Sequence, residues 1–232
     1  MSFNTPAFSA LFILTLCGGC AAGSAVVTDS SPATKSPFPG AEAEAQADPS
    51  AVYDDLVVFT SKATFHGNLG GLSGADEKCN TYAKAAGLKG QFRAWLSDST
   101  TDAISRVPEG GPWRVLDKSG KQAAVAFADR ESWTGYPKAN LENTEFGSTL
   151  SDLSRSTTTE IPYTWTGTKL GGKNAGCSCR DWTSSENFVS CGTGEYGGAI
   201  GSRSARPNDE QWTYVTDNPC DAPAALLCFE LP

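Results

Sequence analysis

The stretch from Gly70 to Asp98, GGLSGADEKCNTYAKAAGLKGQFRAWLSD, constrains the fold most, because it places a cysteine inside an amphipathic helix that leads into a strand. Ser73 is a favourable N-cap, and three residues later the carboxylate of Asp76 can reach back to the cap amide at the positive end of the helix. Gly87 is expected to follow the helix as its C′ residue. Small or apolar residues recur at the helical spacing between these ends, at Ala75, Cys79, Tyr82, Ala83 and Ala86.

Several further elements follow from local patterns. Phe92, Ala94 and Leu96 alternate with Arg93 and Trp95, which predicts a strand directly after the helix. Residues 140–160 are polar and rich in Ser and Thr, so a surface loop is expected there. Other elements are expected as strands at 55–60 and 161–168, a second helix at 97–107, and a hairpin formed by 113–116 and 122–127 around an Asp-initiated turn.

Residues 1–20 have the pattern of a lipoprotein signal peptide. Their apolar run is about ten residues long, too short to cross a membrane but typical of a signal sequence. Two glycines directly before Cys20 resemble a bacterial lipobox, so we expect cleavage before Cys20 and lipidation of its thiol. The residue after Cys20 is Ala rather than Asp, which resembles outer-membrane sorting signals. The alternative is ordinary signal cleavage after Ala21 or Ala22, with release of a soluble, secreted protein.

The segment after the leader, residues 21–54, is rich in Ala, Ser, Thr and Pro. Large apolar residues are almost absent from it before Val52 and Tyr53. Such a segment cannot bury enough surface to offset the entropy of the chain, so a disordered tether is expected. Residues 55–232 then form one domain, which is long enough to build a core.

The charge balance limits the partners of this domain. The whole chain carries a net charge of −8, and residues 55–232 hold 17 basic and 21 acidic residues, a balance of −4. Sequence-independent binding to nucleic acid or polyanionic glycans needs a basic surface, so neither is expected as a partner. A local basic patch around Arg203 and Arg206 is the exception that the sequence leaves room for.

Six cysteines remain after Cys17 and Cys20 are assigned to the leader. An even number in an exported chain predicts a disulfide framework, whose pairing the spacing does not decide. A metal site is the alternative, but the motif Cys177-x-Cys179 lacks the usual spacing of zinc ligands, and His66 is the one histidine. No metal and no cofactor are expected. The six cysteines are Cys79, Cys177, Cys179, Cys191, Cys220 and Cys228.

The stretch GADEKCNTYAKAAGLKGQFRAWLSD resembles the opening of the endostatin domain of basement-membrane collagens. The resemblance continues at TWTGT (164–168), at CRDWT (179–183) and at 219–230, where two cysteines bracket the final strand. The chain is also similar to bacterial endostatin-like domains on surface lipoproteins, some of which bind matrix proteins and complement regulators. The match spans 57–230. It implies a C-type-lectin-like fold, an α+β domain with a mixed, mostly antiparallel sheet, two helices and disulfide staples.

This resemblance implies the disulfide bonds Cys79–Cys228 and Cys179–Cys220, which leaves Cys177 and Cys191 as a third pair. Family members with a zinc site use several N-terminal histidines, which this chain lacks, so zinc is not carried over. The heparin affinity of the collagen-derived relatives depends on arginine clusters. This acidic chain keeps few of them, so weak or absent heparin binding is expected.

The tryptophans divide into core and surface candidates. In the fold of these relatives the residue at Trp165 is a core residue, and Trp182 and Trp212 fall in predicted strands. For each of the three, a structural role is favoured over stacking on a sugar. Trp133 lies in the polar segment ESWTGYP, so it is the tryptophan expected to be exposed.

Residues 192–208 are rich in Gly and Ser, and such loops on a rigid scaffold often carry function. C-type lectins place calcium and sugar in this region, through a Glu/Gln-Pro-Asn/Asp triplet and a Trp-Asn-Asp triplet. Here a cation, Arg206, stands in the first triplet, and the second lacks its Asn-Asp pair, so calcium is not expected. The candidate ligand-binding residues are Tyr196, Arg203, Arg206, Asn208, Asp209, Glu210 and Trp133.

These observations predict a surface-exposed lipoprotein that acts as a monomeric, non-catalytic binding module for a protein or glycan ligand, such as an adhesin. Catalysis is disfavoured because general base chemistry by histidine would have only His66, and no Asp/Glu pair forms a recognisable motif. Two alternatives stay open, a structural envelope protein and an enzyme with reactive cysteines on the same scaffold. Free thiols in the native protein would favour the enzyme.

Overall fold

The computed structural model describes residues 55–149, 152, 163–187, 197–202 and 207–232, all within the unit Gln46–Pro232. The signal peptide and the tether that the sequence predicts at 1–20 and 21–54 lie outside the described residues, as does Cys20. Within the described part, no helix has the length and apolar character that a membrane span needs.

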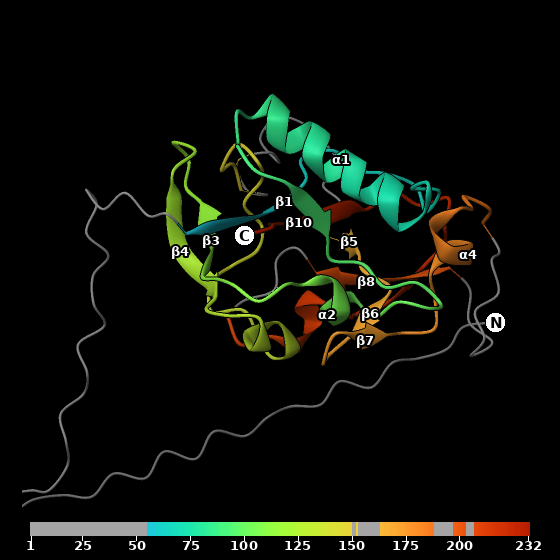
Figure 1. Cartoon of the computed structure of the whole chain (residues 1–232). Coiled ribbons are helices and arrows are strands. Elements are labelled where there is room, and N and C mark those ends of the chain that lie inside the picture. Colours follow the sequence, from blue (N-terminus) through green and yellow to red (C-terminus); the bar gives the residue numbers. More distant parts are fainter. Residues whose placement is uncertain (1–54, 150–151, 153–162, 188–196, 203–206) are drawn as a thin grey trace, which may run out of the picture. The chain divides into compact units, whose positions relative to one another are not determined.

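A mixed sheet forms the centre of the described domain (Figure 1). Its strands are β1 (Leu56–Thr60), β2 (Phe92–Ala94), β3 (Trp113–Leu116), β4 (Gln122–Phe127), β5 (Tyr163–Trp165), β8 (Gly198–Ser202), β9 (Thr216–Asn218) and β10 (Ala225–Glu230). The order is β4-β3-β1-β10-β5-β8-β9, and β2 joins β10 on the same edge as β5. β1 runs parallel to β3, and β10 runs parallel to β5. The other pairs are antiparallel, so the predicted mixed, mostly antiparallel sheet of an α+β domain is confirmed.

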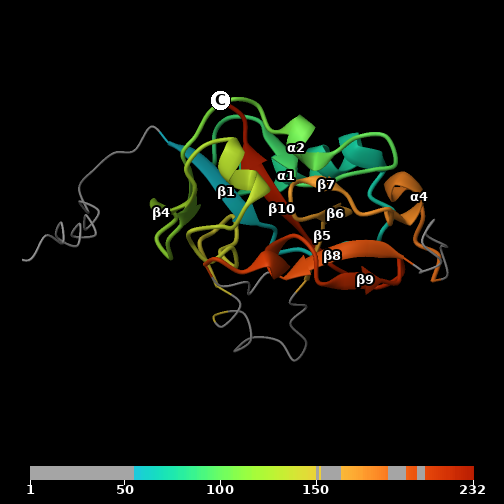
Figure 2. The same ribbon diagram turned by 90° about the horizontal axis from the view of Figure 1, so that it is seen from below.

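Three helices, two 3₁₀ turns and a small hairpin complete the described part of the fold. They are α1 (Gly71–Ala85), α2 (Ala103–Arg106), α4 (Cys179–Trp182), η1 (Glu131–Thr134), η2 (Glu210–Trp212), and a two-stranded sheet of β6 (Thr168–Lys169) and β7 (Lys173–Asn174). Figures 1 and 2 show the long helix α1 lying along one face of the sheet, against β2 and β10. Two helices were expected, and α4 is the additional one.

Alternation along the central strands builds a separate core on each face of the sheet. In β10, Leu226 and Cys228 join one core, and Leu227 and Phe229 join the other. The core under α1, which we call the helix-side core, takes Ala75, Cys79 and Ala83 from that helix and also holds Trp165 and Trp182. The other, the tryptophan-side core, holds Trp95, Trp113, Trp133 and Trp212 with Phe127 and Phe229.

The start of α1 differs from the sequence-based expectation. The helix begins at Gly71, and its N-cap is Gly70, which has a left-handed backbone (φ 84°) and makes no side-chain cap. Ser73 therefore lies exposed within the first turn. The amides of Leu69 and Gly70 both donate to the carbonyl of Trp182, and this contact makes the helix begin two residues before Ser73. The other end is as expected, with Gly87 in the left-handed conformation (φ 76°) directly after the C-cap residue, Ala86.

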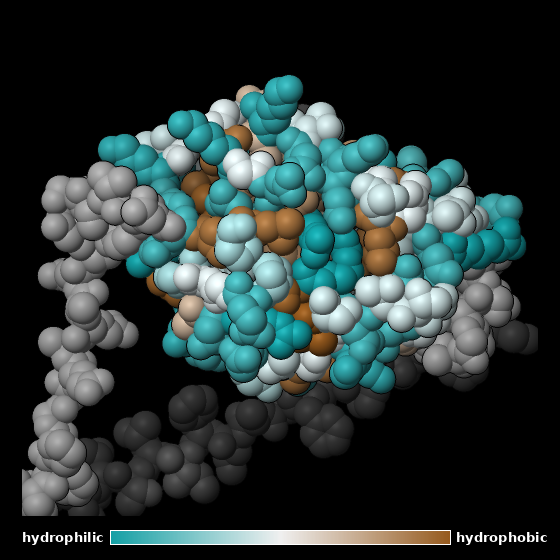
Figure 3. Space-filling model, in the orientation of Figure 1, coloured by the Kyte–Doolittle hydropathy of each residue, from teal (hydrophilic) through white to brown (hydrophobic). Residues whose placement is uncertain are grey.

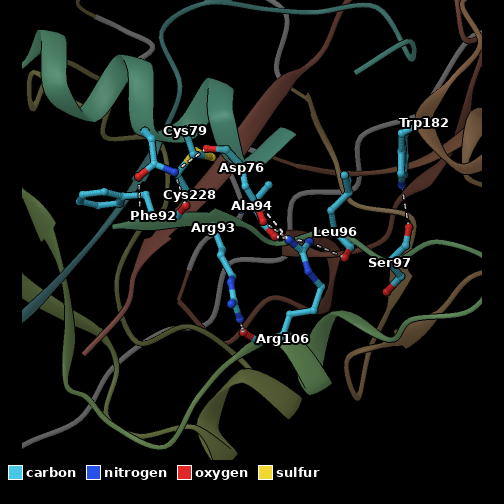
Figure 4. A network of polar contacts seen from close by, with 11 residues as sticks. Asp76, Cys79, Phe92, Arg93, Ala94, Leu96, Ser97, Arg106, Trp182 and Cys228 are labelled. Carbon is cyan, nitrogen blue, oxygen red and sulfur yellow. Dashed lines mark hydrogen bonds and ion pairs between the residues drawn. A yellow bond between two sulfur atoms is a disulfide. The ribbon is translucent and has the colours of Figure 1, made fainter. Parts of the chain in front are cut away.

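Asp76 stabilises more than the end of its own helix, as Figure 4 shows. Its carboxylate accepts a hydrogen bond from the amide of Ala94 and two from the Arg106 guanidinium, at 2.6 and 2.7 Å. Arg106, which is 8% exposed, also donates to the carbonyls of Ala94 and Leu96. One guanidinium nitrogen, Nη2, thus meets both carboxylate oxygens, and this ion pair joins α1, β2 and α2. The expectation that Asp76 reaches back to the cap amide is wrong.

The predicted hairpin is present as β3 and β4, with the Gly120 amide donating to the Asp117 carbonyl in the turn. The second helix is shorter than the predicted 97–107. Ser97 is buried, its hydroxyl accepts from the amide of Ala103, and α2 begins only at that residue. Trp182 and Trp212 are buried as expected but lie in α4 and η2 rather than in strands. The central strand expected at 161–168 is β5, which runs from Tyr163 to Trp165.

Two of the expected disulfide bonds are confirmed, Cys79–Cys228 and Cys179–Cys220. The first links α1 to β10 across 149 residues of sequence. Cys177 is also disulfide-bonded. The pairing of Cys177 with Cys191 stays a prediction, because Cys191 lies outside the described residues.

The turn that carries Cys179 is left-handed, with φ between 47° at Cys179 and 62° at Trp182. L-residues avoid this conformation, so contacts with the surroundings must hold it in place. Three do so. The disulfide fixes Cys179, the Asp181 carboxylate accepts from the amide and hydroxyl of Ser99, and the Trp182 indole donates to the Ser97 carbonyl.

Candidate ligand-binding site

A pocket of about 380 Å³ opens between the β6–β7 hairpin and the segment that contains η2. The hairpin contributes Lys169 and Leu170, and the facing wall consists of Glu210, Gln211, Tyr214 and Val215. The pocket therefore combines apolar side chains with one cation, one anion and one amide. Its volume falls within the range of roughly 300–1,000 Å³ that is usual for small-molecule sites.

Exposed apolar side chains converge on this pocket. Four large ones are exposed among the described residues, and two of the four, Leu170 (38%) and Tyr214 (37%), line the pocket. The other two, Tyr136 and Phe146, are not among its lining residues. The face seen in Figure 3 is mainly hydrophilic, and apolar side chains are visible in several areas between the hydrophilic ones.

A buried network of hydroxyl groups joins the two walls beneath the pocket. Thr168, next to Lys169, and Thr213, next to Tyr214, are both fully buried. The Thr213 hydroxyl donates to the Thr168 carbonyl and accepts from the indole of Trp95 at 2.9 Å. The Thr166 hydroxyl donates to the Thr213 carbonyl at 2.6 Å. Because these groups are satisfied inside a low-dielectric core, they fix the spacing of the two walls.

The η2 wall is held by its own set of contacts. Asp209 caps the turn, since its carboxylate accepts from the Gln211 amide at 2.9 Å. Asn208 has a left-handed backbone (φ 64°), and its amide donates to the Pro137 carbonyl. The indole of Trp212 donates to the Gly135 carbonyl. These bonds fix the backbone of the turn that carries Glu210 and Gln211.

The hairpin wall is fastened to α2 through Asp102. This carboxylate accepts from the Lys173 ammonium at 2.9 Å and from the Asn174 amide at 2.8 Å. The hydrogen bond from Lys173, followed by that from Asn174, holds the pKa of Asp102 below its usual value, and the charge of Lys169 adds to the effect. The amide of Ile104 also donates to the Gly172 carbonyl at the hairpin turn.

Three polar side chains of the pocket have no internal partner among the described residues. Within the part of the chain that the structure describes, the side chains of Lys169, Glu210 and Gln211 form no ion pair and no hydrogen bond. All three residues are exposed. A ligand in the pocket would therefore meet groups that can still donate and accept hydrogen bonds.

A comparison with protein families matches residues 62–200 to the model described as Protein of unknown function (DUF1554). The matched segment covers more than half of the chain. The chain belongs to the DUF1554 family. No curated protein matches it.

The family match divides the candidate site of this DUF1554 protein. Lys169 and Leu170 lie inside the matched segment, whereas Glu210 to Val215 follow it. The matched segment also contains α1 and the turn α4 but ends within β8, before β10 and before Cys220 and Cys228. The residues after the match therefore supply one wall of the pocket and the second partner of both described disulfide bonds.

The structure brings one sequence-predicted residue, Glu210, into the pocket. Asn208 and Asp209 lie directly beside it and hold the η2 turn, which gives them a positioning role at this pocket. Tyr196, Arg203 and Arg206 lie outside the described residues, so their predicted role is untested.

Trp133 is a correction. It was expected to be the exposed tryptophan, but its side chain is fully buried in the tryptophan-side core. Its ring stacks on Phe127 with a centroid distance of 3.9 Å and lies edge-on to Trp113. The surrounding segment is polar because η1 leaves Glu131 and Thr134 exposed, and these hydrophilic neighbours made Trp133 resemble a surface residue. Trp133 cannot contact a surface ligand.

Sequence reasoning missed five of the six pocket residues: Lys169, Leu170, Gln211, Tyr214 and Val215. One weak signal existed. Leu170 is a large apolar residue directly before two glycines in the polar run TKLGGK, which is typical of an apolar side chain displayed at the tip of a hairpin. Tyr214 gave no such signal, because the run QWTYV was interpreted as a strand rather than as a 3₁₀ turn.

Metal ligands do not gather in the described residues, where no group of three or more His, Cys, Asp or Glu side chains could hold an ion. His66 lies exposed in its loop, and its Nδ1 atom is 2.5 Å from the Asp221 carbonyl oxygen. This contact links the loop to the segment after Cys220.

Proposed function

We propose that this DUF1554 protein is a surface-exposed lipoprotein whose domain, residues 55–232, is a non-catalytic binding module for an extracellular protein or glycan. The observation that carries the proposal is the pocket between the β6–β7 hairpin and η2. It displays two of the four exposed large apolar side chains of the described chain, next to a cation, an anion and an amide. Such a mixture on a pre-formed base is typical of recognition sites.

We further propose that the domain has a C-type-lectin-like, endostatin-like fold. Three features support this. The first and last strands of the described sheet are antiparallel neighbours at its centre, the first helix is bonded to the last strand through Cys79–Cys228, and a second bond, Cys179–Cys220, lies near the C-terminal end. This fold carries variable segments between its strands, and the pocket lies on two of them.

The binding role is tested with the purified, oxidised full-length protein on a panel of matrix proteins, serum proteins and glycans, with and without EDTA. We expect at least one saturable ligand whose binding is lost in the double variant Leu170→Ala, Tyr214→Ala. Phe146→Ala is the matched control, because Phe146 is 45% exposed and does not line the pocket. Binding that the double variant retains would place the site elsewhere, and no ligand at all would favour a structural or enzymatic role.

The anchor is tested separately, with a Cys20→Ala variant. If Cys20 carries the lipid, the wild-type protein partitions with membranes and the variant does not, because each buried CH₂ group of an acyl chain contributes about 0.8 kcal/mol. A variant that stays with the membrane fraction contradicts lipidation at this residue.

A further inference from the structure

We infer that the pocket between the β6–β7 hairpin and η2 binds the ring of an uncharged sugar, and that it does so without calcium. This inference rests on the proposed function, since it names the ligand class of the same site. Its basis is the combination of side chains on the two walls rather than any single group.

The apolar groups of the pocket suit the carbon face of a sugar. Tyr214 contributes an exposed aromatic ring from one wall, and Leu170 an exposed aliphatic side chain from the other. Aromatic rings bind apolar C–H surfaces through a large, rigid contact area, and the phenol of tyrosine adds a polar tip. Val215 extends the apolar part of the same wall.

The polar groups of the pocket suit hydroxyl groups. A sugar hydroxyl both donates and accepts, so it is best met by a mixed set of partners. Glu210 offers acceptors, Lys169 offers donors, and the amide of Gln211 offers both. Their side chains have no ion pair or hydrogen bond within the described chain, so a sugar need not break internal contacts to reach them.

The charges in and around the pocket disfavour a charged ligand. Lys169 and Glu210 line the pocket with opposite signs, and residues 55–232 carry a balance of −4. An anionic glycan would meet one cation, one anion and an acidic domain, whereas an uncharged ring meets no net repulsion. A cationic ligand would have to approach Lys169.

Calcium is not required by this chemistry. Calcium takes six to eight oxygen ligands, as a rule with several carboxylates. The pocket lining supplies one carboxylate, Glu210, and places an ammonium group, Lys169, in the same cavity. The sugar would therefore be held by direct hydrogen bonds and apolar contact.

The base of the pocket keeps the cost of binding low. The buried Thr168–Thr213 bond joins the two walls, and Asp209 caps the η2 turn. Because both walls are fixed before the ligand arrives, less conformational entropy is lost on binding. The volume of about 380 Å³ lies near the lower end of the usual range, so the pocket takes one end of a glycan rather than a long segment.

The test is saturation-transfer NMR on the full-length oxidised protein in EDTA, with glucose, galactose, mannose and N-acetylglucosamine as probes. We expect transfer to the ring C–H protons of at least one probe. Tyr214→Ala and Glu210→Ala should each weaken that binding at least tenfold, Tyr214→Phe should retain most of it, and Phe146→Ala should leave it unchanged. Because Tyr214 and Glu210 are exposed, these variants should fold, and their thermal midpoints verify it.

Three other outcomes would overturn the inference and are distinguishable from failure of the proposed function. If an anionic glycan binds through Lys169 and none of the four probes responds, the ligand is a charged glycan and not an uncharged sugar. If EDTA abolishes sugar binding, the pocket needs a metal ion. A protein ligand lost in Tyr214→Ala, again without a sugar response, would keep the binding module but reject the sugar. If neither sugar nor protein binds, both proposals fail.

Discussion

The two faces of the central sheet are stabilised in different ways. On the helix side, α1 buries only small residues, Ala75, Cys79 and Ala83, and both described disulfide bonds lie in that core. On the tryptophan side, no cysteine is among the described core residues, and four tryptophans pack with Phe127 and Phe229. The helix-side core also holds large rings, Trp165 and Trp182 among them, but it adds covalent bonds to them. The tryptophan-side core holds no cysteine among its described residues and depends on the packing of its rings.

The pocket belongs to the region without covalent bonds of its own. Its η2 wall continues from Trp212, and its base bonds to the indole of Trp95, both in the tryptophan-side core. The site should therefore depend on aromatic packing more directly than on the disulfide bonds. This difference can be tested by removing supports from one face at a time.

The largest effect is expected from Cys79→Ala with Cys228→Ala. The bond closes 149 residues, so its loss should lower the free energy of unfolding by about 5 kcal/mol, measured by urea denaturation. The matched control is Cys179→Ala with Cys220→Ala, which opens a separation of 41 residues and should cost about 4 kcal/mol. A larger loss in the control than in the first variant would show that strain, not loop length, governs these bonds.

Trp133→Ala should cost nearly as much on the other face, about 3 to 5 kcal/mol, because a fully buried indole leaves a cavity among aromatic rings. Phe146→Ala, at an exposed position, should change the free energy of unfolding by less than about 0.5 kcal/mol. Thermal and urea unfolding measure both. A loss below about 1 kcal/mol in Trp133→Ala would mean that the tryptophan-side core is not what holds this face.

A smaller effect is expected from Asp76→Asn, which removes the negative charge that the Arg106 guanidinium meets. The Arg106 side chain is 9% exposed in this pair, and a hydrogen bond to a charged group contributes about 1.5 to 3 kcal/mol. Lys118→Ala removes an exposed partner of Asp152 and should have little effect, since water and salt screen that pair. Equal losses in the two variants would contradict a special role for the buried pair.

The smallest effects concern pH and have opposite signs at two carboxyl groups. Burial favours the neutral form of Asp181, but bonds from Ser99 and Ser178 outweigh it and hold the pKa below the usual value. Its contribution to stability is therefore present above the pKa of the unfolded chain and is lost as pH falls through the folded pKa. Burial raises the pKa of Glu230, against a hydrogen bond from the Val57 amide, so its contribution is present below the unfolded pKa and is lost as pH rises.

Unfolding at several pH values between 3 and 7 checks this contrast. Relative to the wild type, Asp181→Asn should lose stability at pH 7 and approach it at pH 3, whereas Glu230→Gln should gain stability at pH 7 and approach it at pH 3. Parallel curves for the two variants would contradict the assigned shifts.

The elements that are determined by local sequence signals were predictable from the sequence. The hairpin of β3 and β4 has its expected bounds because alternation and an Asp-initiated turn are local signals. The end of α1 at Gly87 is equally local. The resemblance to endostatin domains supplied the two confirmed disulfide pairings, which spacing alone did not decide.

Elements that depend on distant partners were not predictable. Ser73 is a good N-cap by type, but the Trp182 carbonyl, more than 100 residues away, sets the start of α1. Ser97 begins no helix because its hydroxyl bonds to Thr168 in the core. The pocket has the same origin, since its walls lie about 40 residues apart in sequence and meet through a buried hydroxyl network. Trp133 shows the converse error, in which polar neighbours concealed a core residue.

The position of β10 has a consequence for the order of assembly. This strand follows all the others in the chain, yet it pairs with β1, β2 and β5 and carries Cys228. In synthesis or in translocation, the chain emerges with its N-terminus first. The strands β1, β2 and β5 then lack their shared partner, β10, until residue 230 has emerged. Cys79 therefore has no native disulfide partner until some 150 further residues have emerged. Oxidation before that point can pair it only with a non-native cysteine.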